Sequence, residues 1–169
     1  MQGDRDAFER LVALYEPRVA RLAQRLLGWV GDVEDVVQDV FLAVYEQGHK
    51  FRGDNEIWPW LTAITVNKCR SRMRRHFLRL RWLKSRPPEE PQLDAADHES
   101  LRDETTIKVR TAVRALPARD REVVVLYYLE DRPVAEISRL LGATENAIDV
   151  RLHRARKRLK ELLGEFAGV

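Results

Sequence analysis

Side chains suited to binding two oppositely charged partners lie next to each other between Asp32 and Arg75. In residues 32–47, carboxylates recur along one edge of a helical pattern, at Asp32, Asp35, Asp39 and Glu46. In residues 57–75, two tryptophans are followed by a run of arginines. A row of carboxylates suits a basic protein surface, whereas cations and aromatic rings together suit nucleic acid, because cations pair with phosphates and rings stack on bases. This arrangement predicts a protein-binding face beside a DNA-binding face.

Charge alternates along the 169-residue chain, although the formal net charge is only +3. Residues 1–56 carry a net charge of −4, and residues 57–88 carry +9 with no acidic residue among them. Residues 89–106 carry −6, and residues 107–169 carry +4. Alternating blocks indicate several partner surfaces, of which at least one binds a polyanion.

No pattern of an enzyme stands out, and we expect no catalytic residue, metal site or cofactor. The sequence lacks a glycine-rich phosphate loop, a nucleophile in a recognisable setting and paired metal-ligand side chains. The single cysteine, Cys69, excludes an intrachain disulfide and fits a reducing compartment. There is no apolar run long enough for a membrane helix, and the N-terminus is too charged for a signal peptide. We therefore expect a cytoplasmic protein without membrane insertion.

Apolar residues recur at three- and four-residue spacing throughout, which predicts an all-α fold. The first helix is expected to begin after an N-cap at Asp6, to kink or restart at Pro17, and to end within residues 28–31. The second helix carries the carboxylates. The third is expected to begin near Ile57 or Pro59 and to continue until the prolines at 87 and 88.

Two small helical domains are expected, residues 1–86 and 106–169. Residues 87–105 between them have few apolar side chains and mostly negative charge, which predicts a flexible acidic linker. In the second domain, Gly142 and Thr144 join two short helices into a helix-turn-helix whose second helix has an arginine-rich outer face. An ordinary helical hairpin would give a similar pattern, but the excess of arginine over lysine favours contact with phosphates and guanines.

The tryptophans and the carboxylate row each have a second interpretation. Trp58 and Trp60 either stack on unpaired bases or belong to the hydrophobic core. The carboxylate row is either a partner surface or a solvated helix face. The spacing alone leaves both alternatives open.

Two passages resemble the extracytoplasmic-function (group 4) sigma factors of bacterial RNA polymerase, which belong to the sigma-70 family. Residues 32–75, which begin DVEDVVQDV and end KCRSRMRR, are similar to sigma region 2. Residues 115–163, which begin ALPARDREVV and end RKRLKELL, are similar to sigma region 4. The two passages occur in the family's order around an acidic linker, which makes the match highly specific.

The resemblance implies a promoter-specificity subunit that binds core RNA polymerase, recognises the −10 and −35 promoter elements and enables transcription initiation. Region 2 would then grip the clamp helices of the largest polymerase subunit through Asp35, Gln38, Asp39 and Leu42. The following loop and basic helix would recognise and open the −10 element through Phe51, Arg52, Trp58, Trp60, Asn67, Arg70, Arg74 and Arg75.

By the same resemblance, region 4 would read the −35 element and touch the flap of the second-largest subunit, and an anti-sigma factor is an expected partner. Helix direction places several side chains toward the major groove or the phosphates, and the candidate set is Thr144, Asn146, Asp149, Val150, Arg151, His153, Arg154 and Lys157. Asp149 departs from the Lys or Arg frequent in the family, and a carboxylate accepts a hydrogen bond from cytosine instead of donating one to guanine.

A different class of function is a sigma-like decoy that titrates an anti-sigma factor, or a helix-turn-helix regulator that binds DNA without polymerase. A plain regulator has no use for the acidic face at Asp35 and Gln38. A decoy has no use for DNA-opening residues such as Trp58, Asn67 and the arginines. The leading hypothesis is therefore the promoter-specificity subunit.

Overall fold

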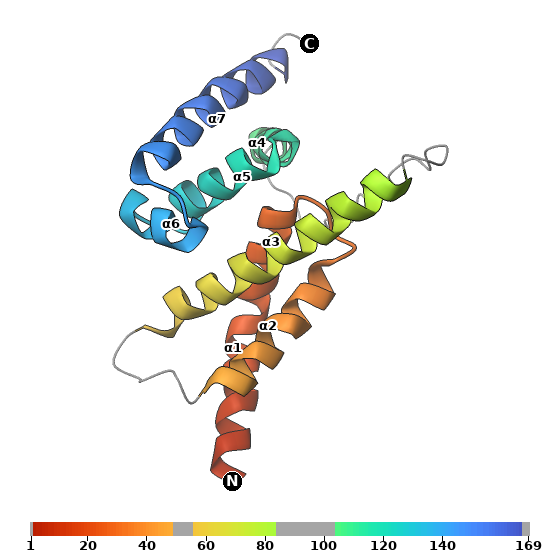
Figure 1. The fold of residues 1–169 in the computed structure, drawn as a ribbon, viewed down its shortest axis with the longest axis vertical. Helices are drawn as coiled ribbons and strands as arrows, with labels where there is room; N and C mark the ends of the chain where they lie inside the picture. Colours follow the sequence, from red (N-terminus) through yellow and green to blue (C-terminus); the bar gives the residue numbers. More distant parts are fainter. Residues whose placement is uncertain (1, 49–55, 84–103, 167–169) are drawn as a thin grey trace. The chain divides into compact units, whose positions relative to one another are not determined.

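The computed structural model describes residues 2–48, 56–83 and 104–166, and these residues are almost entirely helical, with no strand among them (Figure 1). The chain divides into two compact units, which we call unit 1 (Met1–Leu93) and unit 2 (Asp94–Val169). The all-α class predicted from the apolar spacing is confirmed. Most of the predicted linker, residues 87–103, lies outside the described residues.

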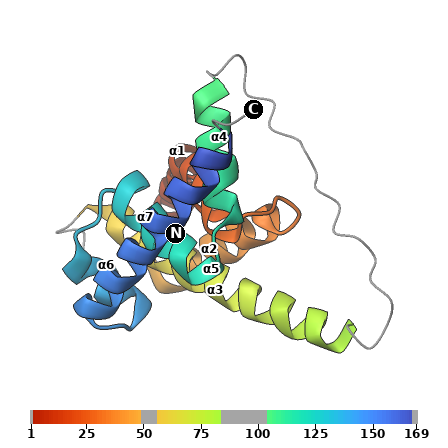
Figure 2. The same cartoon turned by 90° about the horizontal axis from the view of Figure 1, so that it is seen from above.

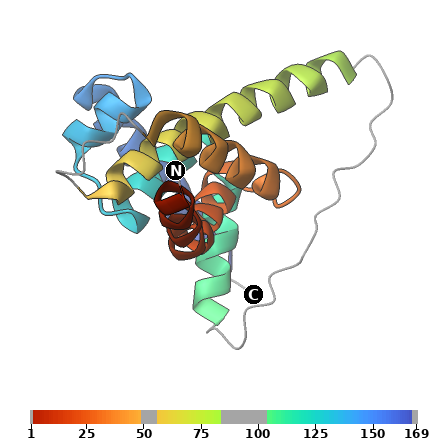
Figure 3. The ribbon, with the colours of Figure 1, turned by 90° about the horizontal axis from the view of Figure 1, so that it is seen from below.

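In unit 1, each of the described helices packs against the other two. They are α1 (Gln2–Leu27), α2 (Val33–Gln47) and α3 (Ile57–Leu83). Each helix contributes an apolar stripe to a shared core, which includes the fully buried Leu22, Val40 and Leu61. The C-terminal half of α3 extends beyond α1 and α2 (Figures 2 and 3), and accordingly Phe77 is 62% exposed.

Unit 2 is built from shorter helices around a separate core. The described elements are α4 (Glu104–Ala115), α5 (Ala118–Val124), the π-helical turn η2 (Val125–Leu129), α6 (Val134–Leu141) and α7 (Glu145–Phe166). Side chains from α4, α5 and α7 meet in one cluster, formed by Leu116, Val124 and Ala155 with Val113, Leu159 and Leu162 packed against them. The long helix α7 therefore holds the unit together.

The predicted helix-turn-helix consists of α6, a tight turn and α7. Gly142 ends α6 with a left-handed backbone (φ 60°), which glycine adopts without steric cost. The Thr144 hydroxyl then accepts a hydrogen bond from the Ala147 N–H at 3.2 Å and caps the start of α7. Ile148 and Leu152 are buried, as the helical spacing predicts, so the opposite face of α7 points to solvent.

One predicted helix boundary in unit 1 is wrong: Asp6 is not an N-cap, because α1 begins at Gln2. Of the two outcomes expected at Pro17, the restart does not occur, since α1 continues through this residue. Proline removes one backbone donor, but tertiary packing just after it holds the helix, since Val19 and Leu22 are fully buried.

The sequence also gave no indication of the π-helical turn in unit 2. The Glu130 N–H donates to the Val125 carbonyl at 3.1 Å, five residues back, so the last turn after α5 is wider than an α-helical turn. The turn ends at Leu129, and Asp131, two residues later, has a positive φ of 55°.

Candidate functional site

The outer face of α2 carries the candidate protein-binding residues. The inner face is apolar and buried, with Val36, Val40 and Phe41 in the core of unit 1. On the outer face, Asp35, Gln38 and Leu42 are exposed and Asp39 is partly exposed. Their spacing places all four on one side of the helix. Leu42 is 56% exposed, so the face combines carboxylates with an apolar side chain.

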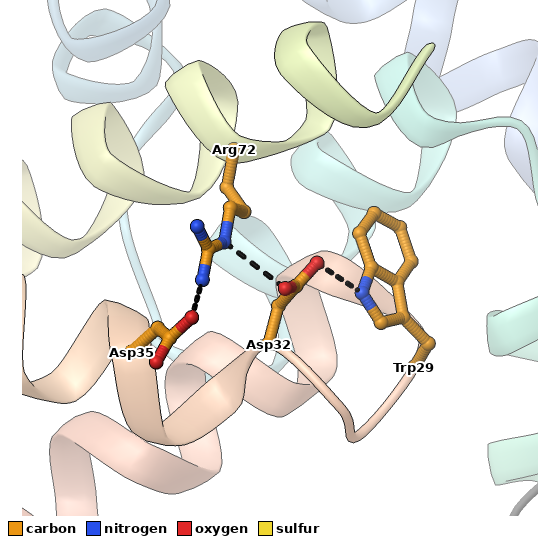
Figure 4. A network of polar contacts seen from close by, with 4 residues as sticks. All are labelled: Trp29, Asp32, Asp35 and Arg72. Carbon is orange, nitrogen blue, oxygen red and sulfur yellow. Dashed lines mark hydrogen bonds and ion pairs between the residues drawn. The ribbon is translucent and has the colours of Figure 1, made fainter. Parts of the chain in front are cut away.

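One end of this face is tied to α3 by Arg72, a residue that the sequence did not single out. Arg72 forms ion pairs with two carboxylates of the second-helix region, lying 3.1 Å from Asp32 (Nε to Oδ1) and contacting Asp35 through Nη2 (Figure 4). The Trp29 indole N–H donates to the other oxygen of Asp32 at 2.9 Å. Asp35 is thus a partner of α3 as well as a candidate contact for another protein.

Trp58 lies in the core of unit 1, which is the second of the two interpretations that its spacing leaves open. Its side chain is only 6% exposed. Its ring stacks on Tyr15 with centroids 6.2 Å apart, and the Arg18 guanidinium lies 3.9 Å from the centre of the ring. A ring covered in this way cannot receive a base without repacking α1 against α3. Trp60, two residues later on α3, is partly exposed and remains a candidate.

The remaining candidates on α3 form an accessible polar and basic surface. Asn67, Arg74 and Arg75 are exposed, and Arg70 is partly exposed. Spacing of three to four residues places Asn67, Arg70 and Arg74 along one side of the helix. The other two residues of the predicted set, Phe51 and Arg52, lie outside the described residues.

The recognition helix of unit 2 presents most of the predicted residues to solvent. Asn146, Asp149, His153 and Lys157 are exposed, as is Val150 at 55%, and Arg151 is partly exposed. Thr144 is exposed too, and its hydroxyl caps the helix. These side chains lie opposite the buried residues of α7, so the face is accessible along its N-terminal half.

Arg154 lies on the same helix but is held by a carboxylate of α5. Asp120 accepts hydrogen bonds from Arg154 Nε at 3.0 Å and from Nη2 at 2.5 Å. These hydrogen bonds raise the pKa of Arg154, and the charge of Asp120 acts in the same direction. The Asp120 side chain is 2% exposed, whereas that of Arg154 is 55% exposed. Sequence reasoning missed Asp120, because 34 residues separate it from Arg154.

Two further arginines serve the internal structure of unit 2. Arg121 is buried and donates through Nη1 to the carbonyls of Arg114 and Leu116 at 2.9 and 3.2 Å, which ties α5 to the end of α4. Desolvation lowers the pKa of Arg121. Arg156 donates to the Tyr128 hydroxyl at 2.6 Å, and this bond raises the pKa of Arg156. The contact links α7 to the π-helical turn.

Among the described residues, no group of three or more His, Cys, Asp or Glu side chains is arranged to hold a metal ion. None of the described helices has the length and apolarity that crossing a membrane requires.

Comparison with protein families identifies both units. Residues 11–77 match the family model for Sigma-70 region 2, and residues 106–159 match the model for Sigma-70, region 4. The chain is 34% identical over 164 residues to the ECF RNA polymerase sigma factor SigM of Mycobacterium tuberculosis, covering 96% of this chain and 80% of that protein. It is 32% identical over 165 residues to the RNA polymerase sigma factor CarQ of Myxococcus xanthus, covering 97% and 93%.

Solved structures of sigma factors are also similar. The sigma factor RpoE, in complex with the anti-sigma factor NepR from Bartonella quintana, is 25% identical with a TM-score of 0.72, covering 94% of this chain and 97% of that one. CnrH, in complex with the cytosolic domain of CnrY, is 30% identical with a TM-score of 0.61, covering 97% and 92%.

Two helical units that match region 2 and region 4 in order define a transcription initiation factor of the sigma-70 type. The chain belongs to the extracytoplasmic-function sigma factors of that family. It is a promoter-specificity subunit of RNA polymerase, and the decoy or polymerase-independent regulator is not favoured. Sigma factors are non-enzymatic subunits of the initiation complex.

Proposed function

We propose that the chain divides promoter recognition between its two units. Residues 1–86 bind core polymerase and open the −10 element, residues 106–169 read the −35 element, and residues 87–105 link them. The observation that carries this proposal is the pairing of unlike surfaces in unit 1. An outer face of α2 with two carboxylates and an exposed leucine belongs to the same small domain as the basic surface of α3.

The α2 face would contact the clamp helices of the largest polymerase subunit. Gln38, Asp39 and Leu42 offer a hydrogen-bonding amide, a carboxylate and an apolar side chain within two helical turns. Charge complementarity directs the encounter with a basic partner, and burial of Leu42 strengthens the complex once water is expelled. Asp35 contributes at the edge of this face while it also pairs with Arg72.

The α3 surface would hold the opened −10 element. Arg70, Arg74 and Arg75 pair with phosphates, Asn67 offers both a donor and an acceptor to an unpaired base, and Trp60 provides a partly exposed ring for stacking. These are the groups that single-stranded DNA requires, so the strand would be captured after the duplex separates.

In unit 2, the exposed face of α7 would enter the major groove at the −35 element. The second helix of a helix-turn-helix contacts base edges through its N-terminal residues, and here Asn146, Asp149 and Val150 occupy that part of α7. Other surfaces of unit 2 would touch the flap of the second-largest subunit.

An anti-sigma factor is a further proposed partner, supported by the similarity to two sigma factors solved in such complexes. The protein would work in the bacterial cytoplasm, where polymerase meets DNA, and would catalyse no reaction itself.

Run-off transcription with core polymerase on a randomised promoter library tests the proposal. The full chain is expected to enrich templates with one −10 and one −35 sequence at a fixed spacing, whereas core polymerase alone enriches neither. If the chain binds core polymerase but enriches no promoter sequence, the proposed roles of α3 and α7 are wrong.

A further inference from the structure

Asp120 is a nearly fully buried carboxylate that lies next to the recognition helix without being part of it. It belongs to the first turn of α5, and its side chain, 2% exposed, reaches Arg154 on α7. A buried carboxylate is stable only when its charge is paired and hydrogen-bonded. Asp120 therefore selects one orientation of the Arg154 guanidinium.

The hydrogen bonds to Asp120 use only one edge of that guanidinium. Arginine has five N–H donors in a rigid plane, and Asp120 binds through the Nε–Nη2 edge. The Nη1–Nη2 edge at the end of the side chain is a second fork with two parallel donors. Since the Arg154 side chain is 55% exposed, part of the group remains accessible to a ligand outside unit 2.

The position of Arg154 on α7 places the Nη1–Nη2 edge on the face expected to contact DNA. Arg154 follows Val150 by one turn on the exposed face, beside His153 and before Lys157. Two parallel N–H donors match the O6 and N7 acceptors of a guanine in the major groove. An arginine fixed in advance also loses less conformational freedom on binding than a mobile one.

We propose that Asp120 is a positioning residue for −35 recognition. It binds the Nε–Nη2 edge of the Arg154 guanidinium, so that the Nη1–Nη2 edge is oriented to read a guanine. The inference rests on the proposed role of α7 at the −35 element and adds to it a residue of α5. Asp120 itself touches no DNA. It affects promoter preference only through Arg154.

The test is selection of −35 variants from a randomised library by holoenzyme assembled from core polymerase and the full chain. Wild type should enrich guanine at one position, and Arg154→Ala should lower that preference by about 5- to 150-fold. Asp120→Asn keeps the shape of the side chain but removes its charge, and should lower preference at the same position by about 2- to 12-fold, the effect of one side chain that is no longer held in place. The double variant should equal Arg154→Ala alone.

Arg158→Ala is the matched control, because it removes an exposed arginine one turn farther along α7. It should weaken all templates alike, as loss of a phosphate contact does. Arg154→Lys retains the charge but lacks the fork, and should therefore lose the guanine preference while keeping the salt dependence of binding.

Four results overturn the inference. Asp120→Asn with wild-type preference would show that Arg154 needs no support, and a loss spread over all −35 positions would indicate general damage to unit 2. Guanine preference retained in Arg154→Lys would exclude the fork. If the wild-type holoenzyme has no −35 preference at all, both this inference and the proposed role of α7 are wrong. If Asp120→Asn keeps the wild-type preference, only the inference about Asp120 is wrong.

Discussion

Arg72→Ala should destabilise unit 1 by about 2 kcal/mol, which is the sum of the contributions from its ion pairs with Asp35 and Asp32. The Asp35 side chain is 61% exposed, so its pairing with Arg72 contributes at most about 1 kcal/mol. The contact with Asp32 joins side chains that are 20% and 26% exposed. Arg72 Nε forms no hydrogen bond with Asp32, so this ion pair, although largely shielded from water, contributes roughly 1 kcal/mol.

Urea unfolding followed by tryptophan fluorescence measures this change in unit 1 alone. All four tryptophans of the chain, at positions 29, 58, 60 and 82, belong to unit 1, so unfolding of unit 2 contributes no tryptophan signal. A domain of this size has an m-value on the order of 1 kcal/mol per molar urea, so the midpoint should fall by roughly 2 M. Asp32→Asn should lower the midpoint more than Asp35→Asn, because Asp32 is less exposed and also accepts from Trp29.

Arg79→Ala is the control, since Arg79 is an exposed arginine on the same helix, and its loss should change the free energy of unfolding by less than about 0.5 kcal/mol. If Arg72→Ala is as stable as Arg79→Ala, the ion pairs of Figure 4 contribute nothing and the reasoning fails. If Asp35→Asn lowers the urea midpoint more than Asp32→Asn does, the less exposed ion pair is not the stronger one, which contradicts the reasoning from side-chain exposure.

Three further predictions concern partner binding, and a fourth concerns the core of unit 1. Asp39→Lys should abolish pull-down of core polymerase while preserving the tryptophan unfolding midpoint, whereas normal pull-down would exclude the α2 face as the contact. Trp58→Ala should destabilise unit 1 by about 3–5 kcal/mol, because it empties a core position. Trp60→Ala should instead reduce permanganate reactivity of the −10 element more than closed-complex binding, and equal loss of both would exclude stacking. Asp149→Lys should change the preferred base in −35 selection, and enrichment of the wild-type sequence would make Asp149 a bystander.

Much of the fold could be predicted from the sequence because local patterns determine it. The apolar stripe of α2, the glycine that ends α6 and the threonine that caps α7 each act within a few residues of chain. The family could be recognised for the same reason, since both passages are continuous segments. The restart expected at Pro17 does not occur, because packing of the residues after it outweighs the local signal, whereas nothing in the structure explains why Asp6 is not the N-cap.

The candidate site was harder to predict, since a residue type does not reveal whether its side chain already packs against or pairs with other residues of the same unit. Trp58 had two interpretations in the sequence, and only packing against Tyr15 and Arg18 assigned it to the core. Arg72 and Arg154 were two among many arginines until the fold placed carboxylates beside them.

The sequence by itself determined the helices, their order, the alternation of charge and the membership of the family, because each depends on neighbours along the chain. Only the tertiary structure decided which cations bind carboxylates inside a unit and which remain available to a partner. Pairs such as Arg72 with Asp35 and Arg154 with Asp120 join residues 37 and 34 positions apart. Their geometry depends on how one helix packs across another, and no local pattern encodes that distance.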